Sequence, residues 1–189
     1  MGEQLAGIAF PEDLAAGLPS DEPLGDWIEG EGKPEPTANV YSSVIAIVLV
    51  SEMFAYLKRV DLGRAVAEVL FRLQPGSGRM RRPDVTFVSY DRWAKDRDLT
   101  SGNEWEVVPE LAVEVVSPTD EAEGLMEKVY EYLAAGVVEV WVIYPALRRI
   151  HRFGPGGAMA SISPSGTLDG GSVLPGFALP LDELFRNKG

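Results

Sequence analysis

Residues 111–144 constrain the fold more than any other part of the chain. Leu111 to Val116 is a nearly continuous apolar run, typical of a strand buried on both faces. Ser117-Pro118-Thr119 then begins a stretch typical of a helix, which we expect to end at Gly136. Val137 to Tyr144 is a second apolar run, rich in β-branched residues. A strand, a helix and a strand in this order favour a parallel crossover in an α/β domain.

The patterns elsewhere predict further elements around this crossover. Proline and glycine clusters separate them, as such residues do at turns. In chain order we expect a long helix, apolar nearly all round and therefore buried, at 40–59, strands at 65–73 and 85–89, a polar loop with a short helix at 91–108, an edge strand at 149–153, hairpins at 154–176 and a short helix at 181–186.

The length of 189 residues fits one domain with a sizeable core. We expect an acidic N-terminal extension, residues 1–38, to pack on a single domain of residues 39–189. Met1 to Phe10 does not resemble a signal peptide, since it has no basic start. The longest apolar run, Val44 to Val50, is too short to span a membrane. We therefore expect a cytoplasmic protein that has no membrane partner.

Composition and charge narrow the classes of function. The chain has no cysteine and one histidine, His151, so disulfides, thiolate metal sites and histidine-rich zinc sites are excluded. A net charge of −12 argues against simple nucleic-acid binding. Residues 57–100, however, hold ten bases against six acids, a local charge of +4. An anionic substrate would meet a positive surface there, although arginines that only keep a strand edge soluble explain the pattern equally well.

Two acidic residues interrupt the apolar pattern of predicted strands. Asp84 stands in Arg82-Pro83-Asp84-Val85, and Glu114 stands inside the strand that begins at Leu111. A carboxylate in a core strand costs free energy unless a partner compensates it, and a hard divalent cation is one such partner. Lys128 follows on the predicted helix. Two acids and a lysine are a minimal set for metal-assisted phosphodiester hydrolysis.

Purely structural interpretations of the same residues stay open. Backbone amides alone would satisfy Asp84 at a strand end. Glu114 would be stable in an ion pair with Lys128 or an arginine, and Lys128 would be stable on a solvated face beside Glu131, three positions further on. His151 fits a surface position on an edge strand.

Several segments, taken in order, resemble a known family. They are Arg82-Pro83-Asp84-Val85 with Phe87-Val88, Glu114-Val115-Val116-Ser117-Pro118-Thr119-Asp120, Glu127-Lys128-Val129 with Glu131 to Val137, Val140-Trp141-Val142, and Leu174-Pro175-Gly176-Phe177 with Leu184-Phe185. Gly63-Arg64, Glu68 and Phe71-Arg72-Leu73 add to the set. The ordered set resembles the bacterial putative restriction-endonuclease family, a branch of the PD-(D/E)xK nuclease superfamily, over roughly residues 26–186.

The resemblance implies a fold and a site. The fold is α/β, with a mixed central sheet flanked by helices and a restriction endonuclease-like core in αβββαβ order. The site would bind Mg²⁺, with Mn²⁺ as a substitute, through Asp84, Glu114 and the backbone carbonyl of Val115. Lys128 would assist the attacking water, and Glu68 would be an additional acid. The substrate would be DNA, and a homodimer is a natural hypothesis because duplex cleavage needs two sites or two visits.

The chain also departs from the pattern of this family. Val116 stands where the superfamily usually has a lysine, and Tyr41-Ser42 stands where many members have a histidine. Two alternatives to a DNA endonuclease stay open, and the net charge of −12 favours both. One is a catalytically degenerate nuclease-fold protein that binds DNA or a protein partner. The other is a metal-dependent hydrolase of a small phosphorylated substrate, which would lack the steep salt dependence of DNA binding.

Overall fold

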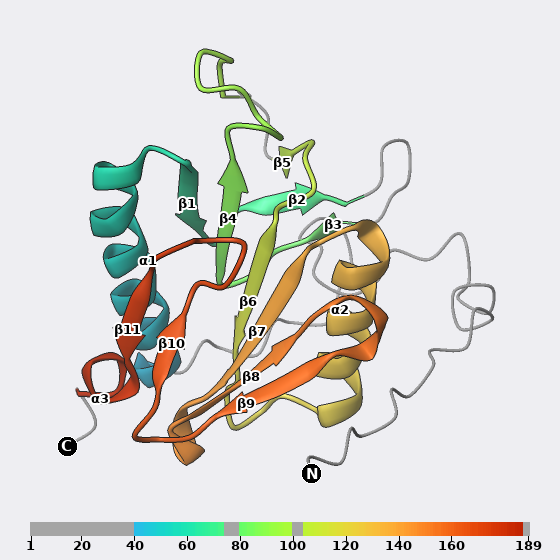
Figure 1. Ribbon diagram of the computed structural model, residues 1–189. Coiled ribbons are helices and arrows are strands. Elements are labelled where there is room, and N and C mark those ends of the chain that lie inside the picture. Colours follow the sequence, from blue (N-terminus) through green and yellow to red (C-terminus); the bar gives the residue numbers. More distant parts are fainter. Residues whose placement is uncertain (1–39, 74–79, 100–103, 187–189) are drawn as a thin grey trace, which may run out of the picture.

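The computed structural model describes residues 40–73, 80–99 and 104–186, so the predicted extension at 1–38 lies outside the described residues. A six-stranded sheet runs through its centre (Figure 1). In spatial order its strands are β1 (Gly63–Ala67), β4 (Val85–Ser89), β6 (Leu111–Val115), β7 (Glu139–Tyr144), β8 (Arg149–Phe153) and β9 (Met159–Ile162). β6 and β7 are parallel, and every other neighbouring pair is antiparallel. The sheet is therefore mixed, as predicted.

The predicted crossover is present. Helix α2 (Ala122–Ala135) connects β6 to β7 and lies on one face of the sheet (Figure 1). Gly136 ends the helix with a φ of 99°, and its amide donates to the carbonyls of Leu133 and Tyr132. This left-handed conformation is one that glycine adopts without a steric penalty, which is why the helix ends where the sequence predicted.

Helix α1 (Val40–Val60) covers the opposite face of the sheet (Figure 1). Ile45, Leu49 and Met53 are fully buried against the strands. The expectation of burial all round was wrong, because Ile47 and Phe54 are 60% and 54% exposed. Among the described residues α1 is long and apolar enough to cross a membrane, a test that core helices also pass.

Alternate residues of each strand contribute to two cores, one on each face of the sheet. Val113, Trp141 and Ile150 pack in the core that α1 covers. Tyr132 and Val140 belong to the second core, on the α2 side. Since side chains of a strand alternate between faces, Glu114 points to the face opposite Val113, toward α2.

Smaller elements flank the main sheet. A three-stranded sheet consists of β2 (Leu70–Arg72), β3 (Met80–Arg81) and β5 (Glu104–Trp105). Near the C-terminus β10 (Thr167–Asp169) pairs with β11 (Ala178–Pro180), and α3 (Leu181–Leu184) follows. The short helix predicted within 91–108 is absent from the described part of that segment, which instead forms turns and β5.

Two predicted strands differ from the structure. The strand predicted at 65–73 is divided into β1 and β2 by a bend at Glu68, whose φ is 53°. The predicted edge strand at 149–153 is an interior strand, because β9 pairs with β8 along its outer side. A repeat of alternating residues predicts a strand but does not say which strands lie beside it.

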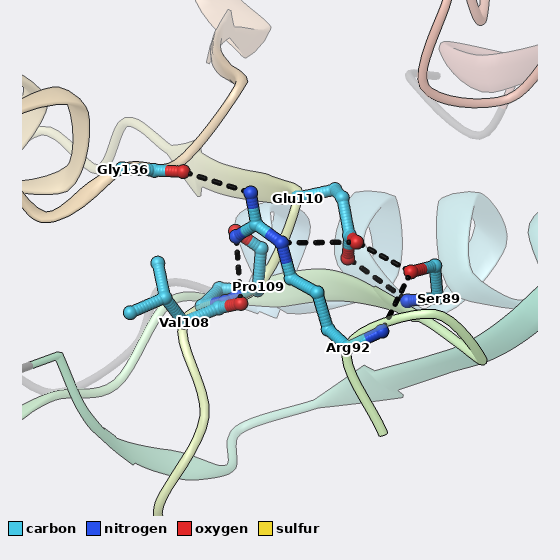
Figure 2. Close-up of polar contacts among 6 residues, drawn as sticks. All are labelled: Ser89, Arg92, Val108, Pro109, Glu110 and Gly136. Atoms are coloured by element: carbon cyan, nitrogen blue, oxygen red, sulfur yellow. Dashed lines mark hydrogen bonds and ion pairs between the residues drawn. The ribbon is translucent and has the colours of Figure 1, made fainter. Parts of the chain in front are cut away.

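Arg92 ties the loop after β4 to the beginning of the crossover. Its guanidinium donates to the carbonyls of Val108 and Pro109 at 2.8 and 2.9 Å and to that of Gly136 at 3.0 Å (Figure 2). It also pairs with the Glu110 carboxylate at 3.1 Å. Arg92 thus joins the residues just before β6 to the glycine that ends α2, and fixes this end of the strand–helix–strand unit.

Candidate nuclease site

Asp84 lies directly before β4, and Glu114 lies on the neighbouring strand β6. Val85 pairs with Val113 across the antiparallel ladder. Continuing this register by one residue places Asp84 opposite Glu114, and paired residues of a ladder point to the same face. The Val115 amide donates to Asp84 Oδ2 at 2.5 Å, which joins the two strands at this point.

Burial governs the protonation of Asp84. Loss of solvent raises its pKa from the ordinary 3.8 to about 6, although the hydrogen bond from the Val115 amide lowers that pKa. The nearby carboxylate of Glu68 raises the pKa further, and the ammonium of Lys128 lowers it. The protein around Asp84 thus does not fully stabilise the negative charge of its ionised form, and a bound cation would do so.

Glu114 is buried, with 6% of its surface exposed, near the end of β6. The phenol of Tyr132 donates to Glu114 Oε1 at 2.6 Å. Lys128 Nζ donates to the other carboxylate oxygen, Oε2, at 3.3 Å. Because Lys128 and Tyr132 are four residues apart on α2, they lie on the same side of the helix, which faces Glu114.

Lys128 pairs with Glu114 and not with the predicted neighbour on its own helix. Glu131 instead forms a buried ion pair with Arg81 of β3, at 2.6 Å. The structure therefore brings Asp84, Glu114 and Lys128 together, as the sequence predicted. It also shows the contacts expected of the structural alternative, a hydrogen bond from a backbone amide to Asp84 and an ion pair between Glu114 and Lys128.

Glu68 was expected on a strand, and this was wrong. Its exposed side chain belongs to the bend between β1 and β2, and its amide donates to the Asp84 carbonyl at 3.3 Å. The carboxylate of Glu68 raises the pKa of Asp84. Glu68 is thus close to Asp84 from an irregular segment that can present its side chain to solvent.

The donor atoms present fit a hard cation that keeps most of its waters. Carboxylate oxygens are the ligands Mg²⁺ prefers, and one or two of them per site are usual. Asp84 and Glu114 supply two carboxylates on one face, and the raised pKa of Asp84 marks a carboxylate without a full complement of positive charge. Within the described ranges no group of three or more acidic or imidazole side chains gathers at one point.

A comparison with protein families matches residues 18–182 to the model of Uma2, described as "Putative restriction endonuclease". The chain belongs to this family. The match spans most of the 189 residues, including both acids, and it confirms the resemblance found in the ordered segments. A search of curated proteins finds no match.

A solved structure from Anabaena variabilis ATCC 29413, titled a putative nuclease belonging to DUF820, is similar to this member of the family. The two superpose with a TM-score of 0.72 at 20% sequence identity. The similarity covers 92% of this chain and 96% of that one. It confirms the predicted α/β nuclease-like fold.

The two departures from the family pattern lie next to each other in space. Val116 packs against the core on the α2 side, which is also the side to which Glu114 points. The Ser42 hydroxyl, at the start of α1, donates to the Val116 carbonyl at 3.2 Å. The beginning of α1 thus reaches the end of β6 just beyond the acidic pair, through a serine and not a histidine.

The contacts of two residues near the site were not predicted. Tyr132 lies in the core on the α2 side, and its hydroxyl also donates a hydrogen bond to Glu114. His151 was placed on the surface of an edge strand, yet it is half-buried on interior strand β8, with its ring 4.9 Å from that of Tyr144. The spacing of four residues between Lys128 and Tyr132 on a helix was the signal that could have placed Tyr132 beside Glu114. The position of His151 depends on strand pairing, which the sequence does not show.

Proposed function

We propose that this protein is a metal-dependent endonuclease that hydrolyses phosphodiester bonds of DNA. The observation that supports it best is the juxtaposition of Asp84, Glu114 and Lys128 on one face of the sheet, in a member of the restriction-endonuclease family. A bound divalent cation would polarise the phosphate and lower the pKa of a water.

In this proposal Asp84 and Glu114 hold the cation, with the Val115 carbonyl as a further oxygen ligand. Mg²⁺ is the expected ion, and Mn²⁺ is expected to replace it. Tyr132 keeps Glu114 in place through its 2.6 Å hydrogen bond. Lys128 orients the attacking water or stabilises negative charge on the phosphate, since its ammonium is only partly buried and lies beside the acids. Glu68, whose amide donates to the Asp84 carbonyl, would be an additional acid for the metal or the water.

Nicking of supercoiled plasmid tests this proposal. With Mg²⁺ or Mn²⁺ present, we expect the wild type to nick the plasmid and Asp84→Asn and Glu114→Gln to lose that activity. Glu127→Gln is the matched control, because Glu127 is an exposed acid of α2 next to Lys128. Loss of nicking in both site variants, with the control active, supports the two ligands.

The alternative is a nuclease-fold protein without catalysis that binds DNA or a partner. The observation in its favour is that Glu114 is already paired with Lys128 and Tyr132. No cleavage by the wild type with either metal, on plasmid or single strands, would favour this alternative.

The homodimer expected for duplex cleavage stays a prediction. The exposed apolar side chains Ile47 and Phe54 on α1 are the surface on which we would place the second copy. Light scattering of the purified protein gives its mass in solution and decides between one copy and two.

A further inference from the structure

The face of the sheet that carries Glu114 continues across the next three strands. Glu114 pairs with Val142 of β7, Val142 with His151 of β8, and His151 with Ser161 of β9. Residues paired across a ladder point to the same face, so His151 and Ser161 share the face of the acidic site. With strands about 4.8 Å apart, the backbone of His151 lies about 10 Å from that of Glu114.

Aromatic rings occupy this face beyond α2. Tyr144, at the end of β7, pairs with Arg149 and contacts the His151 ring at a centroid distance of 4.9 Å. Phe153 follows on the same side of β8, 6.4 Å from His151. Tyr144, Arg149 and His151 are all half-buried, so each presents part of its side chain to solvent. We call Tyr144, Arg149, His151 and Ser161 the β7–β9 strip.

The charge of the strip is positive in a protein whose net charge is −12. Arg148 and Arg152 are neutralised by Asp182 and Glu139. Within the described part of the chain, Arg149 forms no salt bridge, and its guanidinium donates only to the Ser161 hydroxyl, at 3.2 Å. The sequences of β8 and β9 contain no acid. A guanidinium without a carboxylate partner is suited to bind a phosphate.

We propose that the β7–β9 strip binds the DNA strand that flanks the scissile phosphate. Arg149 contacts a backbone phosphate, and the rings of Tyr144 and His151 provide a surface on which a base stacks. Burial and the neighbouring Arg149 lower the pKa of His151, which leaves its ring neutral at pH 7. This inference rests on the proposed nuclease function.

Binding of fluorescein-labelled oligonucleotides, single-stranded and duplex, tests the strip. Every variant also carries Asp84→Asn, so that bound DNA is not cut. We expect Arg149→Gln to raise Kd about tenfold and to reduce the salt dependence by about one phosphate contact. Tyr144→Leu should raise Kd for single strands about tenfold, and Tyr144→Phe, which keeps the ring, should not. Arg59→Gln, the same charge change at the far end of α1, is the control.

The outcomes separate the two proposals. Wild type that nicks plasmid, with strip variants that bind DNA as tightly as the Asp84→Asn parent, overturns the strip and leaves the nuclease function standing. A parent that binds no DNA, together with a wild type that cuts none, overturns both. Weaker binding by Arg149→Gln than by Arg59→Gln, at equal melting temperature, supports the strip.

Discussion

Replacing Asp84 with asparagine should make the metal-free protein more stable while it removes activity. Burial raises the pKa of Asp84 from 3.8 to about 6, a shift of roughly two units at 1.36 kcal/mol each. Ionised Asp84 therefore costs the folded protein about 2–3 kcal/mol at neutral pH. Asparagine carries no charge, and its side-chain carbonyl can still accept the hydrogen bond from the Val115 amide.

The sign of the pH dependence follows from that pKa. Below pH 3.8 the carboxyl is protonated in the folded and the unfolded chain alike. Between pH 3.8 and about 6 the unfolded chain loses this proton while the folded chain keeps it, so the free energy of unfolding falls as the pH rises. Above the pKa of Asp84 in the folded chain, the free energy of unfolding falls no further from this cause. The advantage of Asp84→Asn should thus be absent in acid and full at about pH 8.

Urea unfolding in the presence of a chelator measures this difference. We expect Asp84→Asn to exceed the wild type by about 2–3 kcal/mol at about pH 8, and Glu127→Gln to equal it. Added Mg²⁺ should stabilise the wild type and not Asp84→Asn, because binding to the folded state alone raises stability. An Asp84→Asn variant no more stable than the wild type at pH 8, or equally favoured in acid, would refute the reasoning.

Two further substitutions test the supports of the site. Tyr132→Phe removes a charge-assisted hydrogen bond to Glu114, and we expect about a tenfold rise in the Mg²⁺ concentration for half-maximal nicking, with plasmid affinity unchanged; an unchanged requirement would contradict the role of the phenol. Arg92→Lys loses the fork that donates to three carbonyls (Figure 2), and we expect a loss of about 2–3 kcal/mol in urea unfolding. Arg59→Lys, at an exposed arginine near the end of α1, is its control.

The elements of the core could be predicted from the sequence because their signals are local. The apolar runs beside Glu114 and Trp141 have the composition of buried strands, and Gly136 supplies the conformation that ends a helix. Each depends on a few neighbouring residues. The acidic pair was found for the same reason, since a carboxylate within an apolar run is visible without knowledge of the fold.

What could not be predicted depends on residues far apart in the chain. The position of β8 as an interior strand is set by its pairing with β9, so His151 was assigned to an edge. The bend at Glu68 has a left-handed backbone conformation without a glycine, so the sequence did not indicate it. The exposed side of α1 carries Ile47 and Phe54 as well as the polar Ser51 and Glu52, so apolar residues alone do not mark its buried face.

The location of Lys128 on α2 bears on how the sequences of such a family can diverge. Val116, at the position of the usual lysine, belongs to the α2-side core, on the same face as Glu114. A lysine has a flexible four-carbon stem, so one ammonium position can be reached from the strand or from the helix that packs on it. Two relatives can then place a lysine ammonium at the same point although the lysine stands at different positions in the two sequences. A pattern that fixes the interval along the strand would pass over this chain.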